Sequence, residues 1–301
     1  MSKKKGPIVV VGSLNEDRVY RVASLPRTGE TVRALSETIH FGGKGANQAI
    51  AAARLEAEVA LIGSVGQDEF GEAYVKRVGD SAVSWDGTQS SSATTGSAFI
   101  SIDASGRNTI VVHGGANEAL TAGDIEEREA IIAGAGLLLC QFEVPMDAVI
   151  RACECAAKSG VPIFVNPSPF RHGFPWGRIP VEVAIVNEGE AAMLDEHLDG
   201  GDDFLVRHLV ITRGPDSTLV YGEEELDVES HPAKAVDTVG AGDAFAGALA
   251  AQWGRGKGLE EMVRFANVAG ALATEKVGAQ EAFPDRRAVE ERMSALPSTP
   301  S

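Results

Sequence analysis

The chain has 301 residues, of which 44% are hydrophobic, enough for one large domain with a buried core. A formal net charge of −16 at pH 7 argues against binding to nucleic acids or to anionic membranes through bulk charge. We expect a cytoplasmic protein, because no run of roughly 18 apolar residues could span a membrane and because three cysteines, an odd and low number, are typical of a reducing compartment.

Most of the chain alternates short apolar runs with amphipathic stretches, which predicts an α/β core whose parallel sheet is covered by helices on both faces. The expected strands are Ile8–Gly12, Ala57–Gly63, Leu137–Phe142, Ile163–Asn166, Val183–Asn187 and Leu209–Thr212. The expected helices are Lys44–Leu55, Glu69–Val78, Ala122–Ala133, Met146–Ser159, Ala241–Trp253, Leu259–Lys276 and Arg287–Leu296. The C-terminal segment Pro297–Ser301 is expected to be disordered.

Two regions interrupt this alternation of strands and helices. Gly96–Ile102 and Asn108–His113 alternate polar and apolar residues around the turn Asp103–Arg107, which predicts a β-hairpin. The stretch Asp17–Ile39, between the first strand and the first helix, is polar and extended. Together they predict a small β lid over the active face, discontinuous in sequence and built from about residues 14–40 and 95–115.

The first motif with chemical meaning is the glycine-rich segment Gly42-Gly43-Lys44-Gly45-Ala46-Asn47-Gln48-Ala49. Its glycines let the backbone approach a ligand closely, and helix formers follow at once, so we expect a strand-to-helix site for an anion or a hydroxyl group. It is not a Walker A loop, because Lys44 is followed by Gly45 rather than by Ser or Thr.

Neither the histidines nor the cysteines have the spacing of a metal site. The six histidines are scattered, which predicts structural or surface roles. Cys153 and Cys155 lie two residues apart within an expected helix and therefore do not share a face. We interpret them, like Cys140, as core residues.

The second motif is the run from Asp237 to Gly247, in which Gly240, Ala241 and Gly242 lead into a helix. Unpaired backbone N–H groups at a helix N-terminus attract anions. A carboxylate at this place, that of Asp243, would repel a bound phosphate unless it acts as a base for a hydroxyl group that approaches the phosphate. The run therefore has the parts that phosphoryl transfer to an alcohol needs.

These two motifs resemble the signature regions of the ribokinase-like sugar kinases, the PfkB family, and the resemblance extends from Val9 to Pro284. It implies a three-layer α/β/α fold with a mostly parallel central sheet and a small discontinuous β-sheet lid. Within the family, the likeness is strongest to the enzymes that phosphorylate ribose. It implies ATP-dependent phosphorylation of the 5-hydroxyl group of D-ribose, with Asp243 as general base and Gly240, Ala241 and Gly242 as the anion hole.

The resemblance also implies a set of sugar contacts. The segment from Gly12 to Asp17 resembles the part of the family that binds sugar hydroxyl groups, and Gly115-Ala116-Asn117 and Asn166-Pro167-Ser168-Pro169 match further segments around the site. Carboxylates and carboxamides suit a pentose, because they can accept from and donate to its hydroxyl groups. The implied sugar-binding residues are Asn15, Asp17, Gly43, Lys44, Gly45, Asn47, Glu143 and Asp243.

Nucleotide and metal contacts follow from the same resemblance. The acidic residue of an N-x-x-E region acts through water on Mg²⁺ and phosphate in this family, and Glu190 is its match. The implied nucleotide-binding residues are Asn187, Glu190, Thr212, Arg213, Gly214, Ser217, Gly242 and Asn267. The family also binds a monovalent cation, usually K⁺, for which the implied positions are Asp237, Val239, Ala273, Lys276, Gly278 and Ala282, the last in place of a frequent Ser.

Other interpretations remain open at this point. Residues 191–208 and 81–93 are shorter than the matching segments of typical family members. A homodimer through the β lid is expected, because lids of this family often pair between subunits and an exposed sheet tends to seek a partner. The alternatives are a fructokinase, a 2-keto-3-deoxygluconate kinase, a nucleoside kinase, for which 6% aromatic residues offer few base contacts, or a non-catalytic sensing module, against which Asp243 argues.

Overall fold

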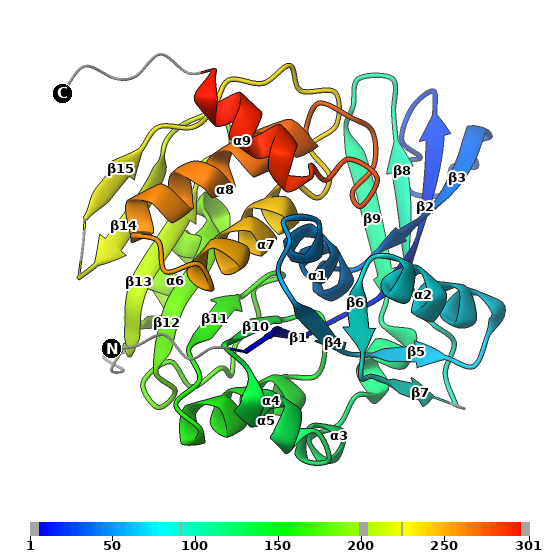
Figure 1. Ribbon diagram of the computed structural model, residues 1–301. Coiled ribbons are helices and arrows are strands. Elements are labelled where there is room, and N and C mark those ends of the chain that lie inside the picture. Colours follow the sequence, from blue (N-terminus) through cyan, green and yellow to red (C-terminus); the bar gives the residue numbers. More distant parts are fainter. Residues whose placement is uncertain (1–5, 91, 199–203, 224, 296–301) are drawn as a thin grey trace.

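The computed structural model describes residues 6–90, 92–198, 204–223 and 225–295 (Figure 1). Within these residues, a nine-stranded sheet forms the centre, in the order β15-β14-β13-β12-β11-β10-β1-β4-β6. Neighbouring strands are parallel except at β13–β14 and β14–β15, which are antiparallel. The strands are β1 (Ile8–Val11), β4 (Val59–Ile62), β6 (Val83–Trp85), β10 (Leu137–Gln141), β11 (Ile163–Asn166), β12 (Val181–Asn187), β13 (Val206–Thr212), β14 (Thr218–Gly222) and β15 (Leu226–Val228).

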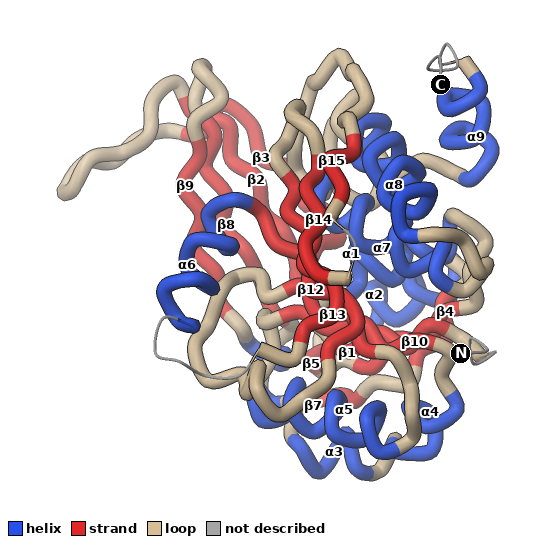
Figure 2. The backbone as a smooth tube through the Cα atoms, turned by 90° about the vertical axis from the view of Figure 1, so that its left-hand side faces the viewer, coloured by secondary structure: helices blue, strands red, loops and turns tan. Residues whose placement is uncertain are grey.

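Helices cover both faces of this sheet (Figures 1 and 2). Alternate strand residues face opposite sides, so that Val10 and Leu139 belong to one hydrophobic cluster and Val9 and Leu138 to the other. The first cluster takes residues from α1 (Lys44–Arg54), α2 (Glu69–Asp80), α7 (Ala241–Trp253), α8 (Leu259–Ala273) and α9 (Arg286–Ser294). The second takes residues from α3 (Ala122–Glu126), α4 (Glu129–Gly134), α5 (Met146–Lys158) and α6 (Glu188–Leu198). The predicted fold class is confirmed.

A separate small sheet, in the order β3-β2-β8-β9, lies to one side of the central sheet and its covering helices (Figure 2). Its strands are β2 (Asn15–Val22), β3 (Ala34–Gly42), β8 (Gly96–Ile102) and β9 (Asn108–His113). Asn15, the first residue of β2, pairs with Gly42, the last residue of β3, so the base of this sheet lies where β1 ends and α1 begins. A further pair of strands, β5 (Ser64–Gly66) and β7 (Thr88–Ser90), lies beside α2.

Three details differ from the sequence-based expectations. The helix expected over Ala122–Ala133 is divided into α3 and α4, with Arg128 between them donating hydrogen bonds to the carbonyl oxygens of Asp124 (2.8 Å) and Gly87 (3.1 Å). Helix α8 ends at Ala273 rather than Lys276. Strands β5, β6, β7, β14 and β15 and helix α6 were not expected. The terminal segment Pro297–Ser301 lies outside the described residues.

All three cysteines are buried free thiols, which confirms their interpretation as core residues. None of the helices in the described part of the chain has the length and apolar character that crossing a bilayer requires.

Asn117 connects the base of the small sheet to the central sheet. It lies in a 3-10 helix (Gly115–Ala119), is 1% exposed, and its Oδ1 accepts from the N–H of Leu14 (2.9 Å). Its Nδ2 donates to the carbonyl oxygen of Leu14 (3.0 Å) and to Oδ1 of Asn15 (2.8 Å). One side chain therefore fixes the turn between β1 and β2.

We predict that Asn117→Ala lowers the free energy of unfolding by about 2–4 kcal/mol, because the buried N–H and C=O groups of Leu14 lose their partner. Urea denaturation followed by circular dichroism measures this change. Asn108→Ala, at an exposed position of β9, is the matched control and should leave the midpoint unchanged. Equal midpoints for the two variants would contradict the prediction.

Candidate active site

The two glycine motifs meet in space, because α1 and α7 pack against each other and begin at the same edge of the sheet (Figure 1). Each helix is entered through a glycine with positive φ, Gly43 at 88° and Gly240 at 78°. This conformation is strained for residues with a Cβ atom, and it lets the chain turn sharply into each helix. Close packing is possible because a Cβ atom on Gly247 would lie 2.7 Å from that of Ala51.

Asp243 lies at the junction of these two helices and is 7% exposed. Its Oδ2 accepts a hydrogen bond from Nδ2 of Asn47 (3.0 Å), and its Oδ1 accepts one from Nε2 of Gln48 (3.0 Å). Each carboxylate oxygen can accept a second bond, so the carboxylate is held in one orientation while it remains able to accept from a hydroxyl group. The N–H of Ala241 donates to the carbonyl of Thr238 (3.3 Å).

The N–H groups of Gly242 and Asp243 occupy the first turn of α7, where a helix offers no acceptor four residues back. The positive end of the helix dipole adds to their attraction for an anion. Backbone donors and the Asp243 carboxylate thus lie side by side, as the run from Asp237 to Gly247 predicts.

Glu143 lies on the other side of the α1 N-terminus. Its Oε2 accepts from the hydroxyl group of Ser13 (2.5 Å) and from the N–H of Lys44 (3.0 Å). The N–H of Gly45 lies 3.4 Å from the same hydroxyl oxygen, to which it donates. The structure therefore places Glu143, Lys44 and Gly45 together, with Asn15 at the adjoining start of β2.

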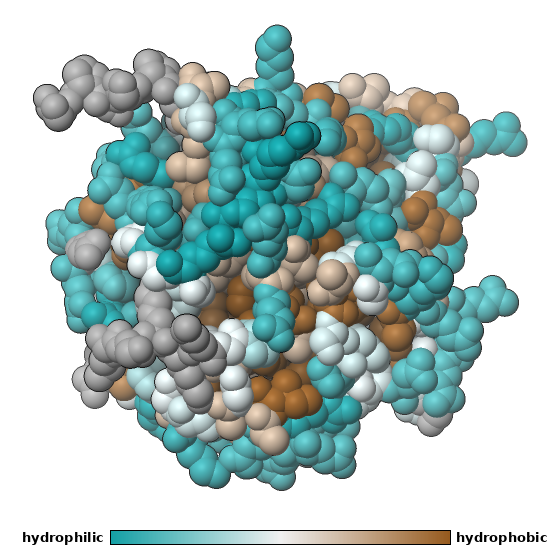
Figure 3. Space-filling model, in the orientation of Figure 1, coloured by the Kyte–Doolittle hydropathy of each residue, from teal (hydrophilic) through white to brown (hydrophobic). Residues whose placement is uncertain are grey.

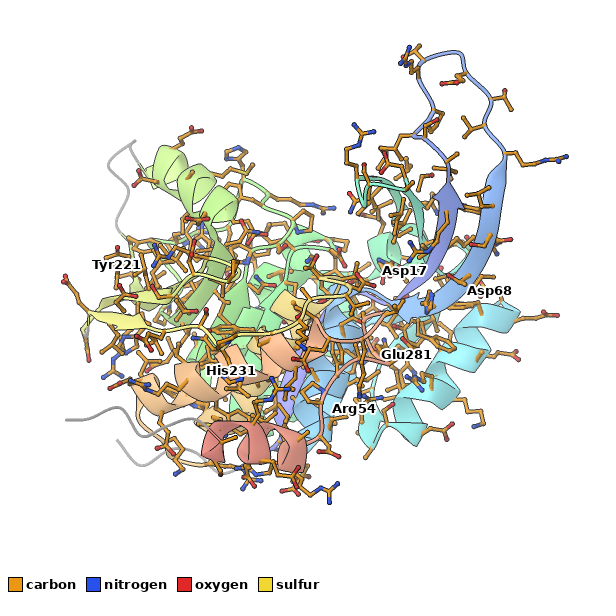
Figure 4. The ribbon with its side chains drawn as sticks, turned by 90° about the horizontal axis from the view of Figure 1, so that it is seen from above. Asp17, Arg54, Asp68, Tyr221, His231 and Glu281 are labelled. Atoms are coloured by element: carbon orange, nitrogen blue, oxygen red, sulfur yellow. The ribbon has the colours of Figure 1, made fainter. Side chains whose placement is uncertain are left out.

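Asp17, on β2, lies against Gly42, since a Cβ atom on this glycine would fall 1.9 Å from Oδ2 of Asp17. Figure 4 shows Asp17 at the base of the small sheet, with Glu281 nearby. Burial, together with the nearby carboxylates of Glu143, Asp243 and Glu281, raises the pKa of Asp17 from 3.8 to about 7. At neutral pH, Asp17 is therefore divided between its protonated and ionised forms.

Lys44 is the positive charge among these carboxylates. Burial by itself would lower the pKa of Lys44, but Asp243, Glu143, Glu190 and Asp17 outweigh this effect, and the pKa is raised. Lys44 therefore stays charged. The contribution of Glu190 shows that the start of α6 lies within electrostatic reach of the α1 N-terminus.

A cavity of about 600 Å³ opens beside the N-terminus of α7. The expected nucleotide-binding residues that line it are Thr212, Gly214, Gly242 and Asn267. Asn267 is held by Thr218, which donates to its Oδ1 (2.7 Å), and by the carbonyl oxygen of Glu229, which accepts from its Nδ2 (3.0 Å). A volume of this size is typical of small-molecule sites.

The other expected nucleotide residues make contacts with one another. Arg213 donates to the carbonyl oxygen of Ser217 (2.8 Å) and to its hydroxyl group, which closes the turn between β13 and β14. Asn187 and Glu190 form a reciprocal capping box at the start of α6, with N–H to side-chain distances of 3.0 and 2.8 Å.

The expected cation-binding positions come from two segments that lie together. The N–H groups of Val236 and Asp237 both donate to the carbonyl oxygen of Thr274, and the Asp237 carboxylate accepts from the N–H groups of Val239 and Gly278, each at 3.0 Å. Ala273 is the last residue of α8, whose C-terminal carbonyl groups favour a cation.

Ala282 is 1% exposed and has no side-chain oxygen, so only its carbonyl group can serve a cation. Lys276 belongs to the same connecting segment after α8. Among the described residues, no group of three or more His, Cys, Asp or Glu side chains could hold a metal ion alone.

Several buried carboxamides of the site were missed from the sequence. Gln48 lies within the first glycine motif, but the motif did not predict a role for it. Besides its bond to Asp243, its Nε2 donates to Oδ1 of Asn166 (2.9 Å), and its Oε1 accepts from Nε2 of Gln141 (2.6 Å). Gln280, which is fully buried, donates to Oδ1 of Asn47 (3.1 Å). The signal that could have found Gln48 is an adjacent pair of carboxamides within an otherwise apolar helix.

Comparisons with known proteins identify the family of this chain. The family model described as pfkB family carbohydrate kinase matches residues 5–286. A ribokinase of Bacillus subtilis is 36% identical over 294 residues, covering 95% of this chain and 99% of the relative, and a ribokinase of Mus musculus is 34% identical over 298 residues, covering 93% and 92%. The structure of Arabidopsis thaliana ribokinase complexed with ribose and ATP superposes with a TM-score of 0.86 at 28% identity, covering 97% of this chain and 99% of that chain. The chain belongs to the pfkB family of carbohydrate kinases.

Proposed function

We propose that this carbohydrate kinase transfers the γ-phosphoryl group of ATP to the 5-hydroxyl group of D-ribose, giving ribose 5-phosphate and ADP. The observation that carries the proposal is the placement of the Asp243 carboxylate beside the free N–H groups of the α7 N-terminus. The relatives named ribokinase and the Arabidopsis structure with ribose and ATP support the choice of substrates.

In the proposed reaction, Asp243 accepts the proton of the 5-hydroxyl group while the oxygen of that hydroxyl group attacks the γ-phosphorus atom. The bond to the β-phosphate oxygen breaks, and ADP leaves. The N–H groups of Gly242 and Asp243, with that of Ala241 once it is released from Thr238, stabilise the negative charge that develops on the phosphoryl oxygens. Lys44 offsets part of the charge that several carboxylates and a triphosphate bring together.

Mg²⁺, when bound with ATP, supplies neutralisation of the phosphate charge. Glu190 is the carboxylate that would hold it through water, which suits an ion that keeps several waters and needs few protein ligands. The electrostatic reach of Glu190 to Lys44 supports this assignment. The N–H of Asn187 donates to Oε2 of Glu190 (3.0 Å) and keeps this side chain near the helix start.

The sugar would lie between the base of the small sheet and the N-terminus of α1. Glu143, Asp17 and Asn15 offer acceptors, while the Lys44 ammonium group and the second N–H of the Asn47 side-chain amide offer donors. We propose that the small sheet, built from residues 14–40 and 95–115, acts as a lid that excludes water from the reacting phosphoryl group.

The exposed face of this lid is apolar enough to pair with a second copy of the chain. Figure 3 shows hydrophobic surface over this region, at the upper right. The large exposed hydrophobic residues that the strand register aligns on one face are Ile39, Phe99 and Val111, whereas Ile110 and Val112 are exposed on the opposite face, that of Asp17. We therefore propose a homodimer through the lid, in the cytoplasm, where the three free thiols would stay reduced.

Asp243→Asn is predicted to lower kcat for ribose by about 10²–10⁴-fold, because the amide cannot accept the proton of the hydroxyl group. A coupled ADP-release assay measures the loss. ATP binding measured by calorimetry should be at least as tight as in wild type, because the substitution keeps the shape of the site and removes a charge that repels the phosphates. Full activity of this variant would refute the assignment of the base.

Asp17 predicts a pH dependence of sugar binding. Hydroxyl groups donate more strongly to an ionised carboxylate, so KM for ribose should rise about 10-fold as pH falls from 8 to 6, through the Asp17 pKa of about 7. Asp17→Asn should remove this dependence.

The stability of the free enzyme should change in the opposite direction, because a raised carboxyl pKa contributes stability at low pH that is lost as pH rises from about 4 through about 7. Asp17→Asn should therefore raise the melting temperature at pH 8. A pH-independent KM for the wild-type enzyme would contradict this role of Asp17.

The segments around Asp237 and Gly278 predict activation by a monovalent cation. We expect higher kcat in KCl than in NaCl at equal ionic strength, by roughly 10-fold, since the ion would order the segments that precede α7. Asp237→Asn should weaken the difference. Equal rates in the two salts would argue against the cation site but not against the kinase.

A further inference from the structure

Gln280 occupies the segment between α8 and α9, outside both glycine motifs, and its side chain is fully buried. Its Oε1 accepts a hydrogen bond from Nε of Arg77 on α2 (3.3 Å). Its Nε2 donates to Oδ1 of Asn47 (3.1 Å) and to the hydroxyl group of Tyr74 (2.8 Å). Since Asn47 donates to Asp243, an unbroken chain of hydrogen bonds connects Arg77 with the Asp243 carboxylate.

The direction of this chain is set by its charged ends. A guanidinium group can only donate, and an ionised carboxylate can only accept. The amide of Gln280 must therefore turn its oxygen toward Arg77 and its NH₂ group toward Asn47, and the amide of Asn47 must turn its NH₂ group toward Asp243. The Tyr74 hydroxyl group accepts from Gln280 and donates to the carbonyl oxygen of Gly42, which is consistent with the amide orientation of Gln280 given above.

We infer that Gln280 is a positioning residue for Asp243: by donating to Oδ1 of Asn47, it fixes the amide orientation that holds Oδ2 of the carboxylate. This inference rests on the proposed function, in which Asp243 is the base. Amide N–H groups do not accept protons, so the chain cannot carry away the proton that Asp243 takes from the sugar. Gln280 therefore acts through geometry alone.

Gln280 also lies between Gly278 and Ala282, two positions of the proposed cation site. The backbone segment that carries Gln280 is thus connected to Asp243 by two side chains, Gln280 and Asn47. The second oxygen of Asp243 has a separate support, because Gln48 is held by Asn166 and Gln141 from the central sheet. Loss of Gln280 leaves this second support in place.

Two substitutions separate orientation from simple loss of a contact. Gln280→Met keeps the length and removes the donor. Gln280→Glu keeps the length, but its ionised carboxylate can only accept, so Asn47 must turn its NH₂ group toward it and present Oδ1 to Asp243, which repels the catalytic carboxylate. At pH 8, we expect kcat for ribose to fall on the order of 10-fold in Gln280→Met and on the order of 10²-fold in Gln280→Glu.

The rates are measured well below the melting temperature of each variant, so that the folded fraction is the same. Gln252→Met, a buried glutamine in the last turn of α7, is the matched control and should keep the wild-type kcat. A Gln280→Glu enzyme at least as fast as Gln280→Met would overturn the inference, as would wild-type kcat in both variants. The expected order of the three variants supports it.

A melting experiment tests the same inference without activity. In an Asp243→Asn background, the introduced amide can donate to Oδ1 of the reoriented Asn47. We therefore expect the loss of melting temperature caused by Gln280→Glu to be smaller in this background than in the wild-type background, by at least about 2 °C. Additive losses would contradict the inference. A wild-type enzyme that releases no ADP with any sugar would contradict the proposed function instead, and the melting comparison would still decide the role of Gln280.

Discussion

The burial of the Asp243 carboxylate is the constraint on which the rest of the site depends. A charged group that is 7% exposed needs a hydrogen-bond partner for each oxygen, and both partners come from adjacent residues of α1, Asn47 and Gln48. Adjacent residues of a helix point in different directions. The carboxylate can accept from both side chains because it lies at the N-terminal ends of two closely packed helices. The absence of a side chain on Gly247, which lies against Ala51, allows this close packing.

The parallel sheet brings the remaining groups to this point. Ligands of open α/β sheets bind beyond the carboxyl ends of the strands, because the helices that follow begin there. Ser13 follows β1, Glu143 follows β10, and Asn187 and Thr212 end β12 and β13. The proposed sugar contacts and nucleotide contacts thus come from different strands of one edge, and the two sets converge on the start of α7.

The parts of this architecture that could be predicted from sequence are those with a local signal. The apolar strands and the two glycine turns have one, and so does Asp243, whose charge is out of place at an anion-binding helix start. The last two strands at one side of the central sheet, β14 and β15, have no such signal, because they are short and partly exposed. The supporting carboxamides do not either: Gln280 contacts Asn47 across 233 positions of sequence, and only tertiary packing reveals such a partner.

The division of charge within the site follows from the two substrates it must hold. Sugar hydroxyl groups need acceptors, a role that we propose for Asp17 and Glu143, whereas a phosphoryl group needs donors, a role that we propose for the N–H groups of α7. In the proposed reaction, these opposite demands meet at Asp243, whose carboxylate lies beside the N–H groups of the α7 N-terminus. Lys44 interacts electrostatically with carboxylates from both parts of the site, and these raise its pKa. A protein with a net charge of −16 can therefore bind a triphosphate only where backbone dipoles and positive groups such as Lys44 locally reverse the sign of its field.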